Sequence, residues 1–121
     1  MIIIDVGAHD GSFFAIPKAK DPNNLVYAVE PIPELASKIK EAGLPNLHVF
    51  CAALGDTDSE STFNINHSDY TSSILDILPE ASDSDWKAYQ QECKTVDTIR
   101  VPVARLDTFC NDNNITEIDF L

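Results

Sequence analysis

The chain has 121 residues, 44% of them hydrophobic and 23% charged, which fits one globular domain and excludes a chain that is disordered throughout. Its 20 acidic and 8 basic residues give a formal net charge of −12, which disfavours binding to nucleic acids and to anionic membranes. Transmembrane runs and a signal peptide are both missing from the sequence, so we expect a cytoplasmic protein whose three cysteines are reduced.

The first 54 residues predict alternating strands and helices. Residues 1–6, 25–29 and 47–54 are apolar runs with little alternation, as in parallel strands that are covered on both faces. Residues 12–20 and 34–42 predict the helices between them. Pro17 lies inside the first helix, where we expect a short first turn or a kink, and Pro31 and Pro33 open the second. Short connections between parallel strands imply right-handed crossovers, so the sequence favours an α/β fold.

The second half of the chain is more polar, and its periodicity is weaker. We expect two strands that pair as an edge hairpin or flap, because Pro102 disfavours a central position in a sheet. A last apolar strand would then lie beside the first, giving the parallel order 3-2-1-4 with helices on both faces. The elements expected here are strands at 61–66, 99–104 and 118–121, and helices at 79–93 and 107–113.

A turn bounded by Gly7 and Gly11 follows the first strand, where glycines allow the backbone to approach a ligand closely. The next helix would direct free N–H groups and its positive dipole end to the same place. Glu30 ends the second strand, where an acidic group can accept hydrogen bonds from both ribose hydroxyls. These residues favour a nucleoside-bearing cofactor. The alternative is an ordinary βα turn, with Glu30 as a solvated strand end.

The glycine spacing helps to distinguish between cofactors. Gly7 and Gly11 are separated by three residues, whereas the dinucleotide fingerprint is G-x-G-x-x-G. Asp5 is unfavourable beside a pyrophosphate but suits a cationic group. The pattern therefore favours S-adenosylmethionine, which carries a sulfonium and an ammonium, and it disfavours a dehydrogenase.

Five segments resemble the FkbM-type methyltransferases in sequence and in order. They are IIDVGAHDG at 3–11, VYAVEP at 26–31, CAALGD at 51–56, YTSSIL at 70–75 and VPVARLDTF at 101–109. The resemblance covers residues 2–121. It implies a Rossmann-like class I methyltransferase fold and methyl transfer from S-adenosylmethionine, usually to a hydroxyl oxygen of a small molecule or sugar.

The resemblance also implies which residues bind the cofactor. Asp5, Gly7, Ala8, His9 and Gly11 would line its methionine part, and Glu30 would hold the ribose. The residues near the adenine would be Pro31, Ala52, Ala53 and Leu54. His9 stands where asparagine is more frequent in the family, which is a mild departure because both side chains are short and polar.

The family continues past position 121 with further strands and helices. We therefore expect the N-terminal portion of such a fold, with no general base assigned and with a sheet edge through which it could self-associate. A non-catalytic nucleoside-binding or interaction fragment stays open as the alternative. The three histidines lack ligand spacing and no CxxC pair occurs, so no metal site is expected.

Overall fold

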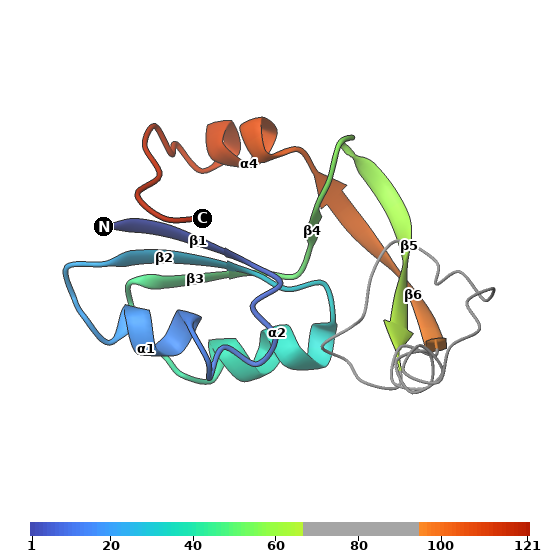
Figure 1. Ribbon diagram of the computed structural model, residues 1–121, viewed down its shortest axis with the longest axis horizontal. Coiled ribbons are helices and arrows are strands. Elements are labelled where there is room, and N and C mark those ends of the chain that lie inside the picture. The colour runs from blue at the N-terminus through green and yellow to red at the C-terminus, as the bar shows by residue number, and fades with distance from the viewer. Residues whose placement is uncertain (67–94) are drawn as a thin grey trace, which may run out of the picture. The chain divides into compact units, whose positions relative to one another are not determined.

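The computed structural model of the chain describes residues 1–66 and 95–121 (Figure 1). The helix expected at 79–93 lies outside the described residues. The chain divides into two compact units, one formed by residues 1–59 with 102–121 and the other by residues 60–101. The candidate site residues all belong to the first unit.

The first unit contains a parallel sheet in the order β1-β2-β3, which confirms the α/β reading of the N-terminal half. Ile3 lies opposite Val26, and Val26 lies opposite Leu47, so one continuous register runs across the three strands. The bounds are Ile2–Val6 for β1, Leu25–Val29 for β2 and Leu47–Phe50 for β3.

Among the described residues, three helices flank this sheet: α1 (Ala15–Ala19), α2 (Pro33–Lys40) and α4 (Leu106–Asp112). Helix α2 begins at a proline, as predicted, because the first helical position has no N–H bond to lose. Helix α1 begins three residues later than expected, because the chain first makes a turn in which the Ile16 N–H donates to the Gly11 carbonyl at 2.9 Å.

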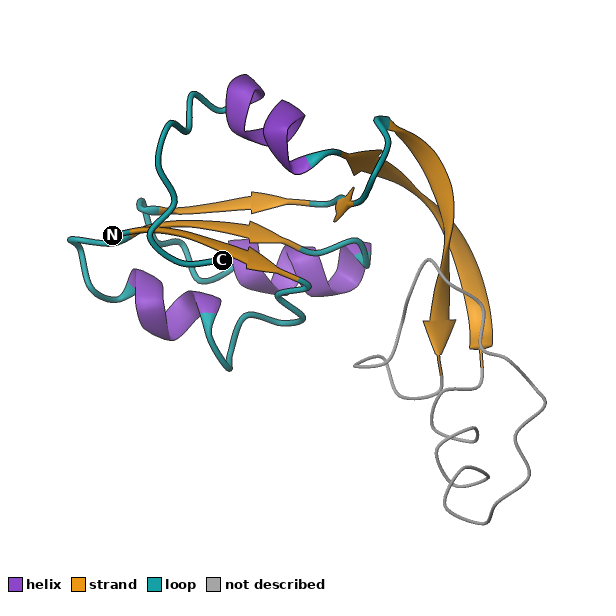
Figure 2. Cartoon of the chain, turned by 45° about the horizontal axis from the view of Figure 1, so that its top comes forward, coloured by secondary structure: helices purple, strands orange, loops and turns teal. Residues whose placement is uncertain are grey.

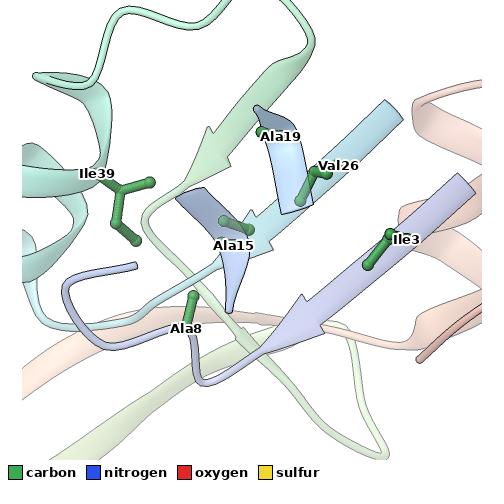
Figure 3. Packing of buried hydrophobic residues seen from close by; sticks show 7 residues of the cluster. Ile3, Ala8, Ala15, Ala19, Val26 and Ile39 are labelled. Carbon is green, nitrogen blue, oxygen red and sulfur yellow. The ribbon is translucent and has the colours of Figure 1, made fainter. Parts of the chain in front are cut away.

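Helices α1 and α2 lie on one face of the sheet and α4 on the other (Figures 1 and 2). Each face carries its own hydrophobic cluster. Ile3 and Val26 point toward α1 and α2, where Ile39 closes the cluster (Figure 3). Their neighbours Ile4 and Tyr27 pack on the opposite face with Phe109 of α4 and Ile115. Burial on both faces explains why the strands are almost uniformly apolar, since each buried aliphatic side chain contributes about 1.5–3 kcal/mol.

The single strand predicted at 47–54 is wrong, because the chain leaves the first sheet after Phe50. Ala53–Leu54 forms a separate strand, β4, which pairs in parallel with Val103 and Ala104. Cys51, in the link between the two strands, is exposed instead of being a core residue of a strand. An uninterrupted apolar run indicates strand structure, and it does not indicate with which partner strand each of its residues pairs.

The expected hairpin is confirmed and is longer than predicted. Strands β5 (Ser59–Asn66) and β6 (Thr95–Ala104) are neighbours in the sheet order β4-β6-β5. The edge position expected for β6 is wrong, because it is the middle strand. Pro102 is tolerated there because β4 pairs only with Val103 and Ala104, beyond the residue that lacks an N–H.

The fourth strand expected at 118–121 is reduced to one parallel bridge, between Ile3 and Phe120. The order 3-2-1-4 is therefore not confirmed, although the Ile4 N–H donates to the Phe120 carbonyl at 2.9 Å. Asp119 extends this contact, because its Oδ2 atom accepts the Ile2 N–H at 2.7 Å. Within residues 1–66 and 95–121, no helix has the length and apolar character needed to cross a bilayer.

Candidate functional site

The turn after β1 contains three residues with left-handed backbone angles, Gly7, His9 and Gly11, whose φ values are +72°, +57° and +78°. The end of β2 holds this turn, because the Val29 carbonyl accepts the N–H groups of Gly7 at 2.8 Å and of Ala8 at 3.2 Å. A tight glycine-bounded turn at the carboxyl end of the first strand is thus present as predicted.

Its two glycines have different surroundings. A Cβ atom on Gly7 would meet no atom within 4 Å, so the space beside this residue is open. A Cβ atom on Gly11 would lie 3.0 Å from Ile39 and 3.1 Å from Ile16. The structure therefore gives Gly11 a packing role between α1 and α2, and it leaves space for a ligand only beside Gly7.

Glu30 is buried at the end of β2, with only 5% of its surface exposed, so the alternative of a solvated strand end is wrong. Its Oε1 atom accepts the His9 N–H and its Oε2 atom accepts the Ile32 N–H, both at 2.9 Å. One carboxylate thus bridges the turn after β1 and the segment that leads into α2.

Asp5 lies on β1 two positions after Ile3, so its side chain is on the same face of the sheet, the one that α1 and α2 cover. It is half-buried, and this desolvation raises the pKa of its carboxyl. Among the described residues, its carboxylate makes no hydrogen bond and no ion pair. A half-buried carboxylate without a partner is stabilised by a cationic ligand more than by any neutral one.

Asp10, which the sequence analysis did not single out, fixes the conformation of the same turn. Its Oδ1 atom accepts the Ser12 hydroxyl at 2.6 Å and the Ser12 N–H at 3.0 Å, and these bonds hold the pKa of the Asp10 carboxyl at about 2. The His9 imidazole lies 3.6 Å from the same oxygen. An aspartate two residues before a serine is the pattern that could have indicated this Asx turn.

The residues expected near an adenine lie in three different segments. Pro31 is buried directly after Glu30, and the Cys51 thiol donates to its carbonyl at 3.6 Å. Ala52 lies in the link after β3, while Ala53 and Leu54 belong to β4. The structure therefore gathers Asp5, the glycine turn, Glu30 and Pro31 at neighbouring strand ends. Contact of Ala52, Ala53 and Leu54 with a cofactor stays a prediction.

A separate open groove of about 660 Å³ lies beside α4. The guanidinium of Arg105 donates to both carboxylate oxygens of Asp107 at 3.1 Å, so its charge is already paired. The lining residues are Gly55, Asp56, Arg105, Leu106, Asp107, Cys110 and Ile118. In the part of the chain that the structure describes, no three His, Cys, Asp or Glu side chains gather closely enough to hold a metal ion.

Comparison with known proteins gives one match. The model of the methyltransferase FkbM domain matches residues 5–121, from Asp5 on β1 to Leu121. No curated protein and no solved structure matches the chain. Because the family model covers nearly all of the sequence, the chain belongs to the FkbM methyltransferase domain family, whose activity is methyl transfer.

Proposed function

We propose that this domain binds S-adenosylmethionine at the carboxyl ends of β1 and β2 and transfers its methyl group to a hydroxyl oxygen of a small molecule or sugar. The observation that supports this most is the half-buried Asp5 carboxylate, which has no partner among the described residues. A nearby cation would stabilise this carboxylate, and the cofactor carries two positively charged groups, the sulfonium and the ammonium.

The other residues of the site fit the same cofactor. Gly7 has open space where a side chain would stand, so the backbone can approach the methionine part. Glu30 is an acceptor for the ribose hydroxyls, and charge-assisted hydrogen bonds of this kind contribute about 1.5–3 kcal/mol each. A pyrophosphate would instead place negative charge beside Asp5, which argues against a dinucleotide.

When bound, the cofactor supplies an electrophilic methyl carbon. Transfer of that carbon to the acceptor oxygen would leave the sulfur as a neutral thioether. The contribution of Asp5, the glycine turn and Glu30 is to hold and orient the reactant, and such positioning supplies much of the rate in a displacement of this type. The acceptor hydroxyl must also lose its proton, and the described residues assign no base to that step.

Titration calorimetry with S-adenosylmethionine, S-adenosylhomocysteine and NAD tests the proposed cofactor. We expect both sulfur compounds to bind and NAD to bind more weakly. Asp5→Asn should weaken S-adenosylmethionine about tenfold or more, because it removes the negative charge that faces the cation. Asp112→Asn is the matched control, since it makes the same chemical change at an exposed carboxylate in α4, outside the glycine turn and the ends of β1 and β2.

Tighter binding of NAD than of the sulfur compounds, or equal losses in the two variants, would contradict the proposal. A methyl-transfer assay with sugar and small-molecule hydroxyl acceptors then separates catalysis from binding. Binding without transfer to any acceptor would leave a nucleoside-binding domain in place of an O-methyltransferase.

A further inference from the structure

Glu30 makes contacts that ribose binding alone does not require. It is nearly fully buried, and its two oxygens accept hydrogen bonds from two backbone segments, at His9 and at Ile32. A carboxylate has about four acceptor positions, and these two bonds use one position on each oxygen. The side chain therefore connects the turn after β1 to the entrance of α2 without any ligand present.

The turn needs such a restraint because of its backbone conformation. His9 has a left-handed φ of +57°, which is unfavourable for a residue with a Cβ atom. It stands between Gly7 and Gly11, which adopt left-handed angles easily and would permit many other conformations of the turn. The charge-assisted bond from the His9 N–H to Glu30 stabilises this conformation at its least favourable residue.

We propose that Glu30 is a positioning residue, which assembles the turn of residues 7–11 in its binding conformation before any cofactor arrives. Only a carboxylate of this length can do so. Glutamine offers one oxygen and one NH₂ group, so one of the two backbone N–H groups would face a donor. Aspartate keeps both oxygens but retracts them by one methylene.

The anchoring itself is tested without a ligand, by NMR-detected amide hydrogen exchange. In Glu30→Gln, the amide that faces the NH₂ group, that of His9 or that of Ile32, should exchange about tenfold faster or more, while that of Val26 in β2 keeps its rate. Asp58→Asn is the matched control. Asp58 also accepts a backbone N–H, from Arg105 at 2.8 Å, so its replacement should accelerate exchange at Arg105 and leave His9 and Ile32 unchanged.

Unchanged exchange at His9 and Ile32 in Glu30→Gln would overturn the proposal. If that variant does not fold, Glu30→Asp takes its place, and faster exchange is expected at His9, at Ile32 or at both. In the wild-type protein, exchange of the His9 amide at the rate of an unstructured peptide would overturn the proposal whatever the variants do.

A second readout separates positioning from ribose contact, and this part rests on the proposed cofactor. Calorimetry compares S-adenosylhomocysteine with its 2′,3′-dideoxy analogue, which has no ribose hydroxyls. If Glu30 only contacts the ribose, the Glu30→Gln variant should bind the analogue as tightly as the wild type does. If Glu30 positions the turn, the variant should bind the analogue about threefold or more weakly than the wild type, and its loss of affinity for the full ligand should be larger still. Equal binding of the analogue by both proteins would overturn the positioning role. If neither ligand binds the wild type, the proposed function fails, and the exchange experiment still decides the anchoring.

Discussion

Residues 1–50 and the elements that follow them differ in the sequence separation between the segments that pair within them. In the first region, each strand pairs in parallel with the next one in sequence, across a crossover that contains one helix. In the second region, Ala53 pairs with Val103, and Asp58 contacts Arg105 and Thr108, which lie 47 and 50 positions away. The first region thus depends on close packing of helices against strands that are neighbours in sequence, and the second on polar contacts between distant segments.

The largest expected effect tests the close packing of the first region. Gly11→Ala should lower the free energy of unfolding by about 2–5 kcal/mol, because it adds left-handed strain and an overpacking contact with Ile39 and Ile16. Gly7→Ala should lower it by only about 1–2 kcal/mol, since it adds the strain without the contact. Urea denaturation measures both. Equal losses would show that the packing around Gly11 adjusts at little cost.

A smaller effect is expected at Asn46, which closes the connection between α1 and β2. Its Nδ2 group donates to the carbonyls of Ala19 at 2.8 Å, Asn24 at 2.7 Å and Asp21 at 3.2 Å. Asn46→Ala should lower the free energy of unfolding by about 1–3 kcal/mol, because it leaves carbonyls without a donor. Asn113→Ala removes one such bond, to Phe109 in α4, and should cost less. A greater loss in Asn113→Ala, by thermal or urea unfolding, would reverse the comparison.

The smallest effects are pH-dependent and have opposite signs in the two regions. Hydrogen bonds from Arg105 and Thr108 lower the pKa of Asp58, so its carboxylate stabilises the fold above its ordinary pKa, and this stability is lost as pH falls. Asp58→Asn should therefore reduce stability at neutral pH and flatten its decrease toward acid.

Burial raises the pKa of Asp5, so its ionisation costs stability, and that cost grows as pH rises from its ordinary pKa through the raised one. Asp5→Asn should therefore increase stability at neutral pH while it weakens the cofactor. Urea unfolding of both variants between roughly pH 3 and pH 7 measures whether each substitution raises or lowers the free energy of unfolding. If Asp5→Asn lowers the free energy of unfolding instead, the Asp5 carboxylate stabilises the fold without a ligand, which would contradict its proposed role.

The difference between the regions also explains which features were predictable. Apolar strands, Pro33 and the glycine turn are local signals, so the elements of the first 50 residues followed from the sequence. The break after Phe50 did not, because Cys51 to Leu54 are small or apolar and fit a continued strand equally well. The middle position of β6 depends on its pairing with β4, which no local pattern records.

The candidate site was predicted to a similar extent. Asp5, Gly7 and Glu30 were identified because strand ends and turn chemistry are visible in the sequence. The packing role of Gly11 could not be seen there, since it depends on Ile39 from a different helix. The same holds for the two backbone contacts of Glu30, one of which reaches back 21 positions to His9.

The contact of Asp119 with Ile2 has a consequence for association between molecules. The outer edge of β1 offers main-chain groups at Ile2 and Ile4, and residues 119 and 120 pair with the N–H of both and with the Ile2 carbonyl. A strand from a second molecule could add to this edge only by displacing those residues, so the aspartate serves as edge protection against sheet extension. Asp119→Ala, which removes the side-chain acceptor at Ile2, should therefore shift the protein toward dimers and larger species in size-exclusion chromatography with light scattering.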